Sequence, residues 1–160
     1  MGARSDMLAK QFEERANALT ETIEKMSDAD WKKVTSAEKW PAGVTAHHAA
    51  GAHEPISGMA KAVAAGQTLP HFTMEMLDQS NAQHAKDCAN CSKAETVALN
   101  KKGTATASAI VKGMSDADLQ KSGTLMTGMP AMTVQQIIEG VLINHVNEHL
   151  GSIQSTIGKK

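Results

Sequence analysis

Apolar residues recur three and four positions apart along almost the whole chain, and runs of alternating β-branched residues are absent. This spacing places the apolar side chains on one face of an α-helix and does not fit a half-buried strand. The sequence therefore predicts an all-α fold. Four long helices are expected at residues 4–26, 41–65, 93–112 and 133–157, with a further helical segment at 73–89.

Local signals predict where these helices begin and end. Ser27 and Ser115 open two nearly identical segments, residues 26–31 and 114–119, in which serine followed by two aspartates is typical of a helix start. Pro55 lies inside the second long helix and should kink or split it, because proline removes a backbone donor and crowds the preceding turn. Gly66 should end that helix. Residues 121–132 are rich in Gly, Ser, Thr and Met and predict a loop.

Four amphipathic helices without a convincing strand predict a four-helix bundle, formed by residues 1–160 as a single domain. A chain of 160 residues buries enough surface to fold without disulfides or a structural metal, so a bound metal would have a functional role. The net charge of −1 excludes a broad attraction to nucleic acid or to anionic membranes. The absence of a signal core and of a stretch of ~18 apolar residues predicts a cytoplasmic protein.

Histidine is the chemically informative residue, because the chain has seven of them and no tyrosine. His145 and His149 are four residues apart and therefore share one face of the last helix. His48 is in phase with the apolar face of the second helix, whereas His47 and His53 lie off that face. Three neutral imidazoles between two facing helices would hold a divalent metal ion and leave a position open for water or substrate. Zinc is favoured, with nickel, iron and manganese as the other candidates.

The same residues also have interpretations that do not involve a metal site. A histidine on an apolar face is commonly a hydrogen-bonded core residue. Glu148 stands one place later than the HExxH pattern of zinc proteases requires, so it is either a surface residue or an outer partner of a metal-binding histidine. Cys88 and Cys91 form a CxxC pair, which could act as a redox pair. Together with His84 they could instead form a second metal site, although a structural zinc ion would need a fourth ligand. The alternative is that both are ordinary thiols. His71, and His84 outside that pattern, have no predicted role.

Several segments resemble the DinB/YfiT-like superfamily. Residues 40–48, Trp-Pro-Ala-Gly-Val-Thr-Ala-His-His, are similar to the Trp-x6-His-His segment of its second helix. Residues 145–149 resemble its closing His-x3-His helix, and residues 73–84 and 94–96 are similar to a proteobacterial branch. The resemblance implies an up-down-down-up four-helix bundle, a divalent metal site on His48, His145 and His149, and frequent homodimers. The choice of His48 over His47 depends on helical phase alone.

Three functions follow as hypotheses. Characterised members of this superfamily include metal-dependent thiol S-transferases that use low-molecular-weight thiols, and a maleylpyruvate isomerase. The resemblance thus implies a metal-dependent transferase or hydrolase that acts on a small molecule, for which a low-molecular-weight thiol is a candidate. The alternative is a non-catalytic bundle that binds a metal or small ligand for a stress or regulatory role. A thiol-disulfide protein using Cys88 and Cys91 is a third hypothesis, and no catalytic residue is predicted from spacing.

Overall fold

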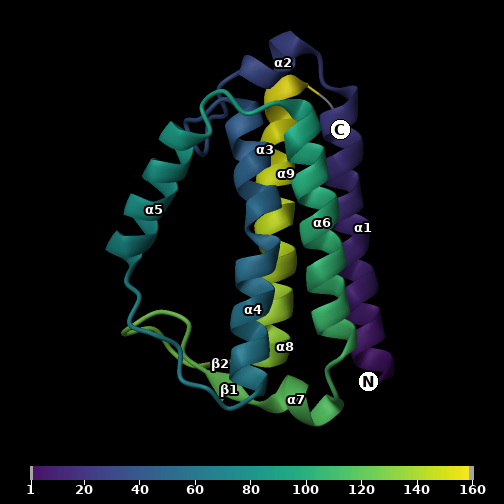
Figure 1. The fold of residues 1–160 in the computed structure, drawn as a ribbon, viewed down its shortest axis with the longest axis vertical. Coiled ribbons are helices and arrows are strands. Elements are labelled where there is room, and N and C mark those ends of the chain that lie inside the picture. Colours follow the sequence, from purple (N-terminus) through teal and green to yellow (C-terminus); the bar gives the residue numbers. More distant parts are fainter. Residues whose placement is uncertain (1, 159–160) are drawn as a thin grey trace.

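The predicted long helices form a four-helix bundle in the computed structural model, which describes residues 2–158 (Figure 1). The second helix is divided in two, and the last contains a π-helical segment. The bundle consists of α1 (Ala3–Lys25), α3 (Ala42–Gly51) with α4 (His53–Ala64), α6 (Lys93–Lys112), and α8 (Val134–Ile137), η1 (Ile138–Ile143) and α9 (Asn144–Ile157). In Figure 1, α1 runs upward, α3–α4 and α6 run downward, and the last helix runs upward. The predicted up-down-down-up connectivity is confirmed.

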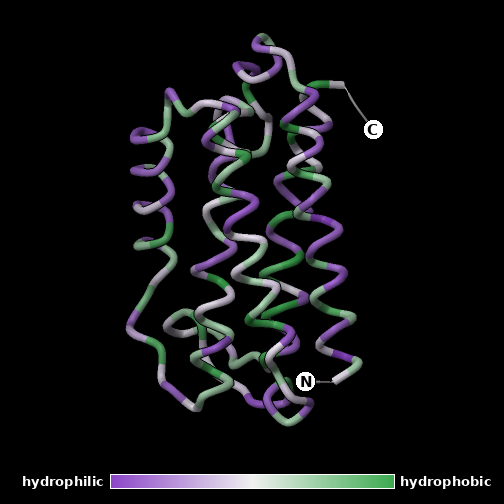
Figure 2. Tube along the Cα trace, turned by 45° about the vertical axis from the view of Figure 1, so that its right-hand side comes forward, coloured by the Kyte–Doolittle hydropathy of each residue, from purple (hydrophilic) through white to green (hydrophobic). Residues whose placement is uncertain are grey.

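The helix α5 (Met74–Asp87) connects the two downward helices. Because α4 and α6 run in the same direction, the chain must return the length of the bundle between them, and α5 is part of this return. It stands to one side of the bundle, and Figure 2 shows it as a largely hydrophilic helix. None of its residues is fully buried. Packing of apolar side chains therefore contributes little to holding α5 in place.

The two predicted serine caps open the short helices α2 (Asp28–Lys32) and α7 (Asp116–Gln120). The side chains of Ser27 and Ser115 each accept a hydrogen bond of 3.0 Å from the backbone N–H three residues on, at Asp30 and Asp118. The aspartate carboxylates accept a bond from the serine N–H in return. Both caps are thus complete capping boxes, which satisfy backbone donors at the helix start.

The predicted division of the second helix is confirmed. The chain breaks at Ala52, between Gly51 at the end of α3 and His53 at the start of α4. Pro55 is the third residue of α4 and has no N–H for a bond to the preceding turn. Gly66 has a φ of 78° and follows the end of α4, as predicted.

Two features of the fold differ from the sequence prediction. Residues 121–132 were expected to form only a loop, but β1 (Ser122–Gly123) pairs antiparallel with β2 (Met132–Thr133). Strands of two residues leave no alternating pattern to detect. The last helix was expected to be continuous, but η1 inserts a π-helical segment that changes the phase of the residues after it.

The buried side chains form two apolar clusters along the bundle. The first includes Phe12, Ile56 and Leu119, and the second includes Leu19, Ile23 and Leu150. Three buried polar side chains come from α1, α4 and α6, one from each helix: Thr20, His53 and Asn100. No helix in the described part of the chain has the length and hydrophobicity needed to cross a lipid bilayer.

His53 was expected to lie off the buried face, but it is 1% exposed and pairs with Asn100. The prediction was wrong because it carried the phase of α3 across the break at Ala52. Beyond that break α4 has a new phase, which turns His53 inward against Phe12, with ring centroids 5.0 Å apart.

Candidate metal centre

Three histidine rings from two neighbouring helices lie against one another. His48 belongs to α3, and His145 and His149 belong to α9. Their ring centroids are 4.5 to 4.9 Å apart, and one ring nitrogen of each lies within 4.8 Å of the others. The Nε2 atoms of His48 and His145 face each other at 3.1 Å. His48, rather than His47, is thus the α3 histidine that lies with the α9 pair.

Small and buried residues bring the two helices close enough for this arrangement. Ala46 and Ala49 on α3 and Val146 and Leu150 on α9 are fully buried in the second apolar cluster. His145 and His149 were expected within the buried face, but Val146 and Leu150 occupy it, because the π-helical turn before them carries an additional residue. The two histidines therefore lie at the edge of the core and are only half-buried. This position gives them both a packed support and access to a ligand.

The environment keeps the rings of His48 and His145 neutral. Burial, together with the neighbouring imidazole His149, lowers the pKa of His48 to about 4. The same two causes lower the pKa of His145 to about 3. Neutral imidazole has a free lone pair, which is the form that binds metal ions. These rings are thus deprotonated near neutral pH without the help of a metal.

Glu38 is a part of the centre that the sequence did not indicate. It lies in the loop before α3, and its carboxylate accepts a 2.7 Å hydrogen bond from Nδ1 of His149 and a 2.6 Å bond from the Ser152 hydroxyl. Burial opposes its ionisation, but hydrogen bonds from Ser152, Thr35 and His149 lower the pKa of the Glu38 carboxyl. Because Nδ1 of His149 is occupied by this bond, Nε2 is the nitrogen left for a ligand. A carboxylate behind a histidine commonly orients metal-binding rings.

The donor set and spacing fit a divalent metal ion. Two nitrogen ligands of a tetrahedral zinc ion lie about 3.4 Å apart, given Zn–N distances of about 2.1 Å. The facing nitrogens of His48 and His145, at 3.1 Å, need only a small adjustment to reach this separation. Glu148 is exposed and accepts a bond from Asn144, so it is a surface residue.

The comparison with known families settles the relationship. The family model of the DinB superfamily matches residues 11–153. The chain belongs to the DinB superfamily. Among solved structures, it is similar to YfiT from Bacillus subtilis, described as "a probable metal-dependent hydrolase with an unusual four-helix bundle topology". The TM-score is 0.75 at 16% identity, and the match covers 100% of this chain and 91% of YfiT.

At this level of identity the likeness to YfiT shows a shared fold. No curated protein is significantly similar to this DinB-superfamily chain. The fold implied by the resemblance of residues 40–48 and 145–149 is confirmed by the family match and by the YfiT-like topology.

Proposed function

We propose that this DinB-superfamily protein is a metal-dependent enzyme that holds a divalent cation, preferably zinc, on His48, His145 and His149 and uses it for hydrolysis. The observation that carries the proposal is the convergence of three imidazoles, one of them hydrogen-bonded to the half-buried carboxylate of Glu38. Three protein ligands leave a coordination position for water or substrate, as is typical of catalytic zinc. The description of YfiT as a probable metal-dependent hydrolase supports this class of reaction.

The chain's own residues orient the ligands. A cation bound here would supply a nucleophile by lowering the pKa of a coordinated water or thiol. Glu38 fixes the tautomer and ring plane of His149 through Nδ1. Trp40 packs edge-on against His48, with ring centroids 5.2 Å apart, and limits the movement of that ring. The partial burial of the three histidines strengthens the attraction between their nitrogens and a cation.

Turnover of model substrates tests this function. We expect zinc-loaded protein to hydrolyse activated esters or amides faster than metal-free protein. In the His149→Ala variant, zinc should no longer increase the rate of hydrolysis. A second assay supplies a low-molecular-weight thiol with a chlorinated nitroarene, because a thiol can take the place of water. Metal-dependent activity only in the thiol assay would overturn hydrolysis in favour of thiol transfer. Activity in neither assay would overturn the enzymatic proposal in favour of a non-catalytic metal-binding bundle.

Glu38→Gln is expected to weaken zinc binding by about 10- to 100-fold, the usual cost of losing the partner that orients a metal-binding histidine. Glutamine keeps the size of the side chain but removes its charge, so His149 is held less firmly. The measurement is a competition titration against a chelator of known affinity. Glu148→Gln is the matched control and should bind zinc as the unmodified protein does, because Glu148 is exposed and bonded to Asn144. Equal affinities in both variants would exclude an orienting role for Glu38.

A further inference from the structure

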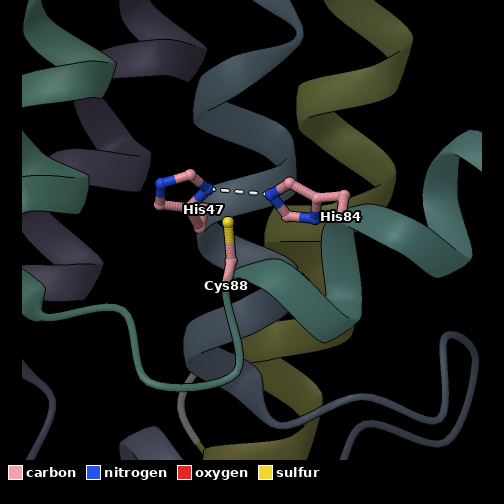
Figure 3. Close-up of side chains that lie close together, drawn as sticks. All are labelled: His47, His84 and Cys88. Carbon is pink, nitrogen blue, oxygen red and sulfur yellow. Dashed lines mark hydrogen bonds between the residues drawn. The ribbon is translucent and has the colours of Figure 1, made fainter.

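A second group of metal-ligating side chains lies next to the first and joins α5 to α3. Figure 3 shows His47, from α3, and His84, from α5, facing each other, with the sulfur of Cys88 directed toward the space between the rings. Nδ1 of His47 and Nε2 of His84 are 2.8 Å apart. One ligand atom from each of the three side chains lies within 4.8 Å of the others. His84 was expected to have no role outside the CxxC segment, and the structure instead places it against His47.

The position of Cys91 explains why only one cysteine of the CxxC pair belongs to this group. The Cys91 thiol is buried and donates to the carbonyl of Gly43 at 3.4 Å. The indole N–H of Trp31 donates to the carbonyl of Cys91 at 3.0 Å. These two bonds attach the turn after α5 to α3, through Gly43, and to α2, through Trp31. Cys88 follows the last residue of α5 and lies on the side of the two rings. Both thiols are free, and burial raises the pKa of each, which does not favour a reactive redox pair.

The electrostatic surroundings favour a cation. The carboxylate of Asp87 acts on both His84 and Cys88, and the carboxylate of Glu95 acts on His47 and Cys88. Both acidic residues are exposed, and lysine is absent from the group itself. The negative charges beside two neutral rings and a thiol therefore offset the charge of a bound metal ion.

We propose that His47, His84 and Cys88 bind a second zinc ion, which fastens α5 to the bundle. Two nitrogens and one thiolate are ligands typical of zinc, with a fourth position left for water. Tetrahedral ligands at Zn–N and Zn–S distances lie about 3.4 to 3.7 Å apart. The facing nitrogens, at 2.8 Å, would have to move apart slightly, and all three ligand atoms already lie within 4.8 Å of one another. On binding, the Cys88 S–H bond breaks, the proton passes to solvent and the sulfur forms a bond to zinc. The ring that holds the proton between the facing nitrogens of His47 and His84 carries it on its other nitrogen instead, so both rings stay neutral and no atom changes oxidation state.

The architecture gives this ion a structural purpose. As α5 has no fully buried residue, it lacks the apolar anchor that other helices of the bundle have. Two of the proposed ligands belong to α5 and one to α3, so a metal ion would supply that anchor. The ring of His84 also lies 5.6 Å from that of His48, centroid to centroid. Fastening α5 would therefore fix a wall beside the three-histidine centre.

Cobalt binding tests this site separately from the first one, because only the second site has a thiolate. We expect metal-free, reduced protein to bind two Co²⁺ ions per chain, with a thiolate-to-cobalt charge-transfer band in the near ultraviolet. Cys88→Ser should lose the band and bind one ion fewer. Cys91→Ser is the matched control and should keep both. His149→Ala should lose one ion and keep the band, so a failure of the three-histidine centre is distinguishable from a failure of this one.

Hydrogen exchange measures the structural effect. Zinc should slow amide exchange across α5 in the unmodified protein and leave it unchanged in Cys88→Ser. Absence of the charge-transfer band, its persistence in Cys88→Ser, or its loss only in Cys91→Ser would overturn the assignment of ligands. A band without slower exchange in α5 would overturn the fastening role.

Discussion

Replacing His145 or His149 by alanine is expected to lower the affinity for zinc by on the order of 10³-fold, well beyond the 10- to 100-fold cost of losing an outer partner. Each variant removes one of only three nitrogens, so the cation keeps two protein ligands. Helicity should be preserved, because both residues are half-buried on α9 and alanine has the highest helix propensity. Metal-dependent turnover should fall to the level of metal-free protein.

The measurement is best made in a Cys88→Ser background, which removes the thiolate of the neighbouring group and leaves one centre to titrate. Calorimetry gives the stoichiometry and affinity, and circular dichroism checks the fold. His71→Ala is the control, since His71 is exposed and bonded to Thr127. A His145→Ala variant that still binds one equivalent of zinc with nearly unchanged affinity would rule out the three-histidine centre.

Much of the fold could be predicted from the sequence because its determinants are local. The period of the apolar residues defined the long helices, and Ser27 and Ser115 marked helix starts that the structure forms as capping boxes. Pro55 indicated the division between α3 and α4. The π-helical segment and the two-residue strands were missed, because neither has a periodic pattern that differs from that of a helix or a loop.

The candidate site was only partly predictable, for a different reason. Helical phase predicted that His48, His145 and His149 share one site, and the structure places their rings against one another. Their role as metal ligands stays a prediction. Glu38 could not be found in this way, since a loop residue has no phase and its contact with His149 spans 111 positions. The contact of His47 with His84 depends on the path of α5 outside the bundle, which local sequence does not specify.

The direction of the helices explains why the two histidine groups are neighbours. Parallel α3–α4 and α6 require a long return of the chain, and α5 supplies it beside α3. His47 and His48 are adjacent in sequence, so their side chains leave α3 in different directions. His48 meets α9 at the edge of the core, and His47 meets α5 outside the bundle. A single pair of histidines thereby connects the core of the bundle with its crossover helix.

Asn100→Ala is expected to destabilise the protein by about 3 to 5 kcal/mol, because each buried polar group left without a partner costs about 1 to 3 kcal/mol. The Asn100 amide N–H groups donate to the carbonyl of Ala16 at 2.8 Å and to the hydroxyl of Thr20 at 2.7 Å. Its oxygen therefore faces Nε2 of His53 at 2.7 Å, which makes that nitrogen the donor. Asn100 is fully buried and His53 is 1% exposed, so water cannot replace these bonds without opening the bundle.

Thermal and urea unfolding of metal-free protein measure this effect, and the expected loss corresponds to a fall in Tm of about 6 to 20 °C for a domain of this size. Asn144→Ala is the matched control: its amide bonds to Glu148 on the surface, so its change should stay within about 0.5 kcal/mol. The double variant Asn100→Ala with His53→Ala should lose less stability than the sum of the single losses, because the two residues share one bond. Additive losses, or a loss below about 1 kcal/mol for Asn100→Ala, would contradict a buried network that links α1, α4 and α6.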